Sequence, residues 1–339
     1  MSNQIFETLK DLPIPLQGPQ CVLHKHELLI CGSWKESASI KLLYCLLDLI
    51  VMGKNKHTFV MKYVSIWDNI LNKSNELNNY NEWIPFTDNK NHPIIIGRDN
   101  DKYVGVRAVI GGINNNLLFI TYLPTNISVF DLNTFQFIKH DTLPAKNYIE
   151  YHCFVSKSEN EQKNKQNYQM LLFCKKAGLS IEYDEDKNTF QFRQIHVYKD
   201  ITRLRYAYVC INDVILFFGG YSWINNELII SKSVHKYSIR ENKWMTFQDT
   251  LSSPLFACIA ILSEEDNNIH IIGGVDDKTE VLTHIKTKVR VWDHSQLSMK
   301  EIKFAIQYLI RTLKIKLGWI NDFDQIIINT IDEMNFALK

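Results

Sequence analysis

Few residues of this chain combine the types and the spacing that metal chemistry requires. His24 and His26 are two residues apart, so a β-strand would place both imidazoles on one face, as a pair of metal ligands. No third ligand can be positioned beside them, and a solvent-facing hairpin is the simpler explanation. The acidic triplets at 99–101 and 184–186 lie among residues that are typical of hairpin turns. We therefore expect no metal ion.

Catalytic motifs are equally scarce. No glycine-rich phosphate loop follows a strand, because each double glycine lies inside a pattern of paired strands. Histidines are spread over the whole chain, and spacing places no nucleophile–histidine–acid set. The seven cysteines include no close pair and have mostly apolar neighbours, which indicates reduced thiols in a core. We expect no catalytic residues, no cofactor and no small-molecule substrate.

Composition narrows the class of protein further. The 339 residues are 45% hydrophobic, enough for a large core, and the formal net charge of +1 argues against nucleic-acid binding. The most apolar stretch, 40–52, is too short to span a bilayer and contains Lys41 and Asp48. The first residues do not form a secretory signal. We expect a cytoplasmic protein that binds neither membranes nor nucleic acid.

A repeated phrase runs along the chain: an apolar run ends in two small residues, and an aromatic strand follows about nineteen residues later. The copies are 214–218 before Gly219-Gly220, 269–272 before Gly273-Gly274, 107–110 before Gly111-Gly112, and 28–31 before Gly32-Ser33. Gly220 and Gly274 are 54 residues apart, and Gly112 precedes Gly220 by 108, twice that period. A degraded copy, 170–174 followed by Lys175-Lys176, falls in the gap.

Each repeat is predicted to form four short antiparallel strands: two apolar runs around the glycines, an alternating third strand, and a fourth strand after a turn. The glycines suit a close backbone approach. Aromatic pairs separated by six residues are expected to pack between adjacent sheets; they are Phe130 and Phe137, Tyr183 and Phe190, and Tyr237 and Trp244. Small radial sheets of this kind form a β-propeller. Its predicted core includes Val109, Ile110, Phe217, Phe218, Ile271 and Ile272.

The sequence from the apolar run through Gly219-Gly220 and Tyr237 to Trp244 resembles a kelch repeat. The resemblance is closest at 206–248, good at 254–293 and 104–143, weaker at 147–196 and 57–86, and covers roughly 20–295. The Asn- and Lys-rich loops resemble kelch motif proteins of some protists. Kelch repeats imply a propeller of six or seven blades but no definite activity, because the fold hosts binding modules and enzymes alike.

The two ends of the repeat region complement each other. Residues 12–16 resemble 251–255, the link that leaves the fourth strand of the best repeat, so 5–9 are predicted to be a fourth strand without a repeat of its own. The last repeat lacks that strand, and 5–9 would complete it and close the ring. We therefore assign 1–295 to the propeller and 296–339 to a helical extension, in which 299–338 carry helical periodicity for a hairpin of two helices. That hairpin would pack on the rim or dock a partner.

One blade is expected to be incomplete. Two periods of 54 should separate Gly32 from Gly112, but only 80 residues do, a shortfall of about half a blade. The segment that fills the gap, 39–51, lacks the glycine pair and the turns of the other units, and fits helix as well as strand. We predict a nominally six-bladed propeller that is irregular at 33–56.

Arginine and aromatic residues near strand ends are the candidates for binding a partner, because these side chains dominate interaction hot spots. They are Arg98, Arg107, Arg205, Tyr206, Tyr221 and Trp223. The alternative is that they seal neighbouring blades. A galactose-oxidase-like or sialidase-like enzyme is the competing class, but the chain shows neither a tyrosine–histidine–cysteine metal set nor an aspartate box. We predict a non-catalytic scaffold that binds a protein partner of unknown identity.

Overall fold

The computed structural model describes residues 5–12, 15, 17, 20–24, 27–31, 40–43, 48–51, 58–61, 84–88, 90–98, 100–157, 167–197, 204–263, 266–277, 279–293, 307 and 309. The chain separates into two compact units, Met1–Trp292 and Asp293–Lys339. All the described strands lie in the first unit.

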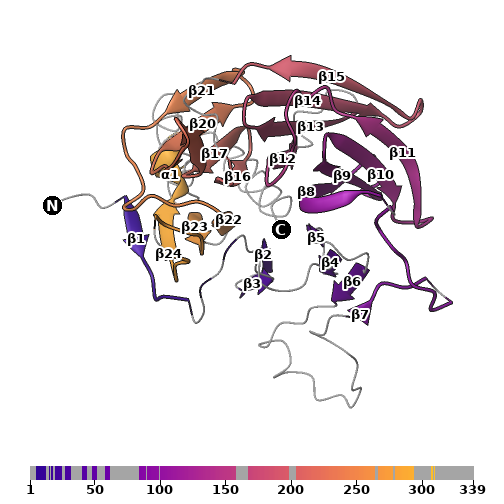
Figure 1. Ribbon diagram of the computed structural model, residues 1–339, viewed down its shortest axis with the longest axis horizontal. Helices are drawn as coiled ribbons and strands as arrows, with labels where there is room; N and C mark the ends of the chain where they lie inside the picture. The colour runs from indigo at the N-terminus through magenta and orange to yellow at the C-terminus, as the bar shows by residue number, and fades with distance from the viewer. Residues whose placement is uncertain are drawn as a thin grey trace, which may run out of the picture. The chain divides into compact units, whose positions relative to one another are not determined.

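Four antiparallel sheets of four strands form regular blades of a β-propeller, which confirms the predicted all-β class (Figure 1). The first has β8 (Lys102–Gly111), β9 (Leu117–Leu123), β10 (Asn126–Asp131) and β11 (Gln136–Thr142). The second has β12 (Cys153–Ser156), β13 (Asn167–Cys174), β14 (Ala177–Asp184) and β15 (Thr189–Ile195). The third has β16 (Ala207–Ile211), β17 (Val214–Phe218), β20 (Val234–Ser238) and β21 (Lys243–Thr246). The fourth has β22 (Ile259–Ser263), β23 (Asn268–Ile272), β24 (His284–Lys288) and β1 (Phe6–Thr8).

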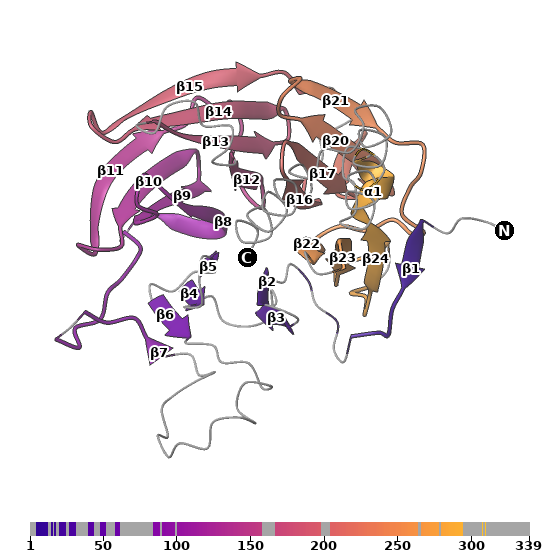
Figure 2. The same ribbon diagram turned by 180° about the vertical axis from the view of Figure 1, so that it is seen from behind.

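Burial follows the position of a strand within its blade. All five residues of β17, a second strand, are buried, because neighbouring blades cover both of its faces. The outer strand β11 instead alternates between exposed and half-buried residues. The strands β8, β12, β16 and β22 lie nearest the centre in both face views (Figures 1 and 2).

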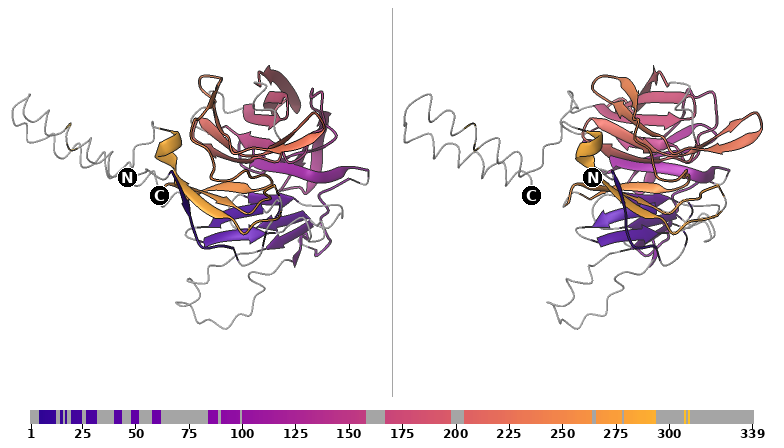
Figure 3. Two further views of the ribbon diagram at one scale, coloured as in Figure 1. Left: turned by 60° about the vertical axis from the view of Figure 1, so that its left-hand side comes forward. Right: turned by 90° about the vertical axis from the view of Figure 1, so that its left-hand side faces the viewer.

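The strand β1 completes the last blade, as predicted from the two ends of the repeat region. Phe6 pairs with Thr287 and Thr8 with Ile285 in an antiparallel ladder. The ladder continues beyond the strand, because the Leu9 amide donates to the His284 carbonyl at 2.8 Å. Figure 3 shows the indigo β1 running along the orange β24. The chain therefore closes its ring with main-chain hydrogen bonds.

The aromatic pairs join the third and fourth strands of their blades. The two residues of each pair stand directly opposite each other on the paired strands; the pairs are Phe130 and Phe137, Tyr183 and Phe190, and Tyr237 and Trp244. Each of the last two pairs also contacts a phenylalanine of the preceding blade. The Tyr183 ring lies 5.2 Å from that of Phe119. The Tyr237 ring lies 4.8 Å from that of Phe173. For these two pairs, the predicted packing between adjacent sheets is confirmed.

The double glycines do not all occupy the same place in a blade. Gly219-Gly220 and Gly273-Gly274 follow a second strand and have positive φ. Gly111 instead ends the first strand β8, and Gly112 lies in the turn to the second strand β9. The predicted equivalence of Gly111-Gly112 with the other pairs is therefore wrong by one strand, and its spacing from Gly220 is coincidental. The residues that follow Gly111-Gly112 form β9, whereas the residues that follow Gly219-Gly220 in the third blade form an inserted hairpin.

The misassignment of Gly111-Gly112 by one strand also makes two of the predicted core residues wrong. Phe217, Phe218, Ile271 and Ile272 are buried as predicted. Val109 and Ile110 are only half-buried, because they belong to β8, a first strand at the centre of the ring. The unbroken runs of buried residues in this blade lie instead on β9 and β10, the second and third strands.

The third blade carries an insertion that the repeat did not predict. Between β17 and β20 the chain forms a separate two-stranded hairpin of β18 (Tyr221–Ile224) and β19 (Glu227–Ile230). The corresponding links of the first two blades, 124–125 and 175–176, are two residues long. The hairpin is therefore a local addition to a common blade.

The chain before β8 departs from the regular pattern. The strands β2 (Gln20–His24) and β3 (Glu27–Cys31) form a two-stranded ladder. The strands β4 (Ile40–Leu43), β5 (Asp48–Val51), β6 (Thr58–Met61) and β7 (Ile84–Pro85) form a sheet of order β5-β4-β6-β7. Its β4–β6 pair is parallel, unlike the strand pairs of the regular blades. This irregular sheet lies where the spacing predicted an incomplete blade; the rest of 33–56 lies outside the described residues.

A short helix, α1 (Val289–Trp292), follows β24. It places Trp292 in the core, where the indole nitrogen donates to the Thr287 hydroxyl at 2.9 Å. Among the described residues, no helix is long and apolar enough to cross a membrane. The predicted helical hairpin at 299–338 lies outside the described residues, apart from Gln307 and Leu309, which are helical.

Candidate partner-binding surface

A left-handed backbone conformation recurs near the start of the first strand of each regular blade. Gly105, Tyr151, Arg205 and Ala257 all have φ between 47° and 66°. Each lies two residues before the first strand starts its regular pairing. The Tyr151 amide donates to the Gly105 carbonyl at 2.8 Å, and the Ala257 amide donates to the Arg205 carbonyl at 2.7 Å. These equivalent positions therefore carry main-chain hydrogen bonds from one blade to the next.

At two of these positions, Tyr151 and Arg205, the side chains stack on each other. A Cβ on Gly105 would lie 2.6 Å from the Tyr151 nitrogen and 2.8 Å from its ring, so only glycine fits beneath this tyrosine. On the ring of Tyr151, the Arg205 guanidinium carbon lies 4.2 Å from the centroid, within cation–π distance. The Arg107 guanidinium carbon lies 5.9 Å from the same centroid. Two arginines from different blades thus share one aromatic ring.

A fourth side chain, that of Tyr221, joins this group from the inserted hairpin. Its amide and carbonyl exchange hydrogen bonds with Leu204, the residue before Arg205. Burial raises the pKa of Tyr221, and the positive charge of Arg205 opposes that rise. Burial likewise raises the pKa of Tyr151, against the opposing charges of Arg205 and Arg107. We call Arg107, Tyr151, Arg205 and Tyr221 the Tyr151 cluster.

The structure brings together three of the six residues that the sequence proposed for partner binding. Arg107, Arg205 and Tyr221 meet in the Tyr151 cluster. Trp223 lies on the same inserted hairpin and is exposed. Tyr206 is buried, and its hydroxyl donates to the Phe173 carbonyl of the preceding blade at 2.6 Å. Tyr206 therefore seals two blades, as the alternative interpretation of these residues expected.

Sequence reasoning missed the residue at the centre of the cluster. Tyr151 precedes Arg205 by 54 residues, the period of the repeat, so extending the alignment in front of the first strand would have found it. Its left-handed backbone could not have been found this way, because Tyr, Arg and Ala do not favour positive φ.

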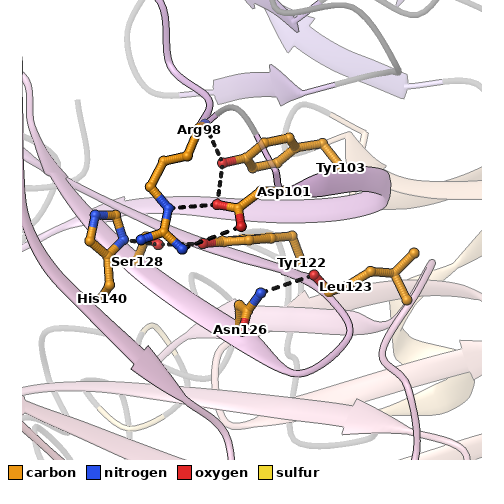
Figure 4. A network of polar contacts seen from close by, with 8 residues as sticks. All are labelled: Arg98, Asp101, Tyr103, Tyr122, Leu123, Asn126, Ser128 and His140. Atoms are coloured by element: carbon orange, nitrogen blue, oxygen red, sulfur yellow. Dashed lines mark hydrogen bonds and ion pairs between the residues drawn. The ribbon is translucent and has the colours of Figure 1, made fainter.

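Arg98 belongs to a different group of polar side chains, in the first blade (Figure 4). Its Nε donates to Asp101 Oδ2 at 2.7 Å, and the Tyr103 hydroxyl donates to the same oxygen at 3.2 Å. Burial raises the pKa of Asp101, but hydrogen bonds from Arg98 and Tyr122 and the charge of Arg98 lower it overall. Arg98 is thus held in an ion pair apart from the Tyr151 cluster.

The same group contains a serine beside a histidine, a pair that suggests catalysis at first sight. Ser128 Oγ lies 2.8 Å from His140 Nδ1 and 2.9 Å from the Tyr122 hydroxyl. Ser128 is 0% exposed, so no substrate can reach its hydroxyl. The carboxylate of Asp101 hydrogen-bonds to Tyr122, on the serine side of the pair, and not to the far nitrogen of the histidine as a triad requires. This group holds the strands of the blade together and does not have the geometry of a nucleophile.

The positions first considered for metal binding have other roles or lie outside the described residues. The described part of the chain contains no group of three or more His, Cys, Asp or Glu arranged to hold a metal ion. The Asp184 carboxylate accepts hydrogen bonds from the amide and the ammonium group of Lys187, as expected of a hairpin turn. His26 and Asp99 lie outside the described residues.

The Tyr151 cluster combines fixed positive charge with aromatic surface. Guanidinium groups are suited to carboxylates, to which they donate two parallel hydrogen bonds. The negative charge of Glu150 raises the pKa of both Tyr151 and Tyr221. Two positive charges and one negative charge therefore lie near these rings. The arrangement is suited to binding an anionic side chain and offers no exposed nucleophile.

Comparison with known proteins identifies no family for this chain. No protein-family model matches the sequence, and no curated protein matches it. The structure of YjhT is 13% identical over 37% of this chain and 34% of its own, with a TM-score of 0.29. The β-propeller domain of Cps50 (Swd1) from Myceliophteria thermophila is 7% identical over 55% of this chain and 53% of its own, with a TM-score of 0.36. The chain thus spans about a third and about a half of these structures, and the propeller assignment rests on the strand pairing described above.

Proposed function

We propose that this protein is a non-catalytic, kelch-type propeller of the cytoplasm that binds a protein partner through the Tyr151 cluster. The observation that carries the proposal is the convergence of Arg107 and Arg205, from two different blades, on the ring of Tyr151. Arginine and tyrosine are enriched among the residues that dominate protein interfaces. Blade-to-blade hydrogen bonds hold the backbone at Tyr151 and Arg205, which reduces the entropy that binding would cost.

The kelch assignment within this proposal is supported by the order of strands in the 206–248 repeat. The glycine pair follows the second strand, and Tyr237 faces Trp244 across the third and fourth strands. The Trp244 indole donates to the His196 carbonyl of the preceding blade at 2.9 Å. The residues that define the sequence resemblance therefore pack one blade against the next.

The proposal is tested by affinity purification of the tagged full chain from its own cells, followed by mass spectrometry. We expect a specific partner that is lost from the Arg107→Ala/Arg205→Ala variant. Arg193→Ala is the matched control, because Arg193 is an exposed arginine on β15, away from the cluster, and should retain the partner. Equal capture by both variants, at equal thermal stability, would contradict the assignment of this surface.

A metal analysis of the purified protein tests the competing enzyme class. A propeller oxidase would contain copper, so a stoichiometric amount of this metal would overturn the non-catalytic proposal. We expect only trace amounts.

A further inference from the structure

The inserted hairpin presents a defined set of side chains on each of its two faces. Its turn, Asn225-Asn226, has φ values of 50° and 66°, as a two-residue type I′ turn requires. Tyr221 stands opposite Ile230, and Trp223 stands opposite Leu228. Residues that stand opposite each other on paired strands point to the same face of the sheet, and successive residues along one strand point to opposite faces. These four side chains therefore lie on one face of the hairpin. The other face carries Ser222, Ile224, Glu227 and Ile229.

The hairpin is unusually apolar for a segment in contact with water. Trp223 is 64% exposed and Ile224 50%, while Leu228 and Ile229 are 44% and 40% exposed. In the described part of the chain, this two-stranded sheet pairs with no further strand, apart from the single bridge between Tyr221 and Leu204. Contiguous apolar side chains of this kind mark surfaces that another molecule covers.

One of the two faces continues directly into the Tyr151 cluster. Tyr221 belongs to both: it shares a face with Trp223, and its ring lies 5.1 Å from that of Phe256 at the base of the hairpin. The positive charge of Arg205 opposes the rise in the pKa of Tyr221 that burial causes. Tyr221 and Trp223 are two strand residues apart, which corresponds to about 7 Å along a strand. The backbone hydrogen bonds between Tyr221 and Leu204 hold the start of this face beside Arg205, and the exposed indole of Trp223 lies two strand residues further along.

We propose that the face formed by Tyr221, Trp223 and Leu228 and the adjoining arginines of the Tyr151 cluster bind an extended peptide segment of a partner protein. The segment carries an Asp or Glu two residues from an aromatic or aliphatic residue. This proposal rests on the proposed function and specifies the chemistry of its partner.

Complementary charge favours this occupant. The carboxylate pairs with Arg107 and Arg205, while the apolar side chain covers Trp223 and Leu228. A second copy of the chain is disfavoured, because an isologous contact through this face would bring the arginines of both copies together. In an extended chain, alternate residues point to the same side and are separated by the same distance as Tyr221 and Trp223.

The test uses a phage-displayed library of random dodecapeptides, selected on the folded full chain. We expect the selected peptides to share an acidic residue two positions from an aromatic or aliphatic residue. One selected peptide, labelled with fluorescein, is then measured by fluorescence polarisation. Changing its acidic residue to the amide should weaken binding about tenfold or more, as loss of a charge-assisted contact at a hot spot does.

Variants of the protein separate the two halves of the surface. Arg205→Gln and Trp223→Ser should each weaken the peptide about tenfold or more. Ile229→Ser is the matched control for the hairpin, because Ile229 is an exposed aliphatic residue on the opposite face, and Arg193→Gln is the control for the arginine. Both controls should stay within about twofold, at unchanged thermal stability.

Several outcomes would overturn the inference. They are a library that yields no binder, selected peptides without an acidic residue, and equal losses from Trp223→Ser and Ile229→Ser. A concentration-dependent dimer in sedimentation that Trp223→Ser abolishes would assign the face to a second copy instead. If the cellular partner depends on Arg107 and Arg205 but not on Trp223, this inference fails while the proposed function stands.

Discussion

The rings of Phe6 and Trp292, from the two ends of the first unit, lie with their centroids 5.4 Å apart. Phe6 is on the closing strand β1, and Trp292 is on the helix that follows its partner strand β24. Both side chains are buried in the cluster that also contains Phe218. The closure of the ring therefore combines main-chain pairing with an aromatic contact.

Removal of the closing strand should destabilise the protein strongly. Deletion of residues 1–10 opens the edge of β24 and uncovers Trp292, so the melting temperature should fall by several degrees or more. Phe6→Ala alone should cost about 3 kcal/mol, as is usual for a buried phenylalanine, in urea unfolding. Glu7→Ala is the control: its exposed carboxylate is 3.4 Å from Lys286, and its loss should cost under about 0.5 kcal/mol. Equal effects of the two substitutions would show that Phe6 does not anchor the strand.

Gly219→Val should destabilise by a few kcal/mol. A Cβ at this position would overlap the Leu255 carbonyl oxygen, and the φ of 66° is strained for any L side chain. Chemical denaturation measures the loss, with Gln136→Val on the exposed β11 as a control for the added apolar surface. A change for Gly219→Val within about 0.5 kcal/mol, typical of surface sites, would remove the steric role of this glycine.

Trp244→Phe should cost about 1 kcal/mol, because it removes the hydrogen bond to the His196 carbonyl while retaining an aromatic ring. Trp223→Phe, at an exposed site on the hairpin, should leave stability unchanged. If the two variants unfold at the same urea concentration, the indole does not contribute to the contact between these blades.

The stability of the last blade should decrease in acid. His270 Nδ1 lies 3.0 Å from His284 Nε2 on adjacent strands, and Lys286 stands opposite His270. Burial lowers the pKa of both histidines below the ordinary 6.5; Lys286 lowers both further, the neighbouring histidine lowers that of His284, and Asp266 partly opposes the shift at His270.

Because the folded pKa is lower than the unfolded pKa, the unfolded chain binds more protons between the two values. The stability that the neutral pair contributes is therefore complete above about pH 6.5 and is lost as the pH falls through the folded pKa values. Urea unfolding at pH 7.5 and 5.5 should show this loss, and His284→Gln should reduce it. His92→Gln is the control, because the His92 side chain is 72% exposed. An unchanged pH dependence in His284→Gln would contradict the assignment.

The sequence revealed the parts of the fold that one blade repeats from another. The spacing of Tyr237 and Trp244 is the length of a tight hairpin, so it recurs wherever the third and fourth strands pair. Gly111-Gly112 misled the alignment because Gly112, in the turn between two strands, has positive φ like the glycines that follow β17 and β23. The spacing alone could not distinguish the two positions.

The candidate site was only partly predictable, for a different physical reason. Arg107 and Arg205 were chosen for their residue types and strand-end positions, but Tyr151 unites them through a stack between blades. Such a contact depends on how three blades lie against one another, which no single repeat specifies. The inserted hairpin was missed because its apolar residues were counted as part of an ordinary repeat.

The closing strand also sets an order of events during synthesis. The partner of Phe6 is Thr287, so nearly the whole first unit must leave the ribosome before β1 can pair. At translation rates of about 5–20 residues per second, roughly 15–60 s pass between the synthesis of β1 and that of its partner strand β24. The blades in between can fold one after another during that time, but the ring cannot close. Strand β1 is thus synthesised long before its partner strand β24, and until β24 emerges the nascent chain carries an unpaired strand that chaperones can bind.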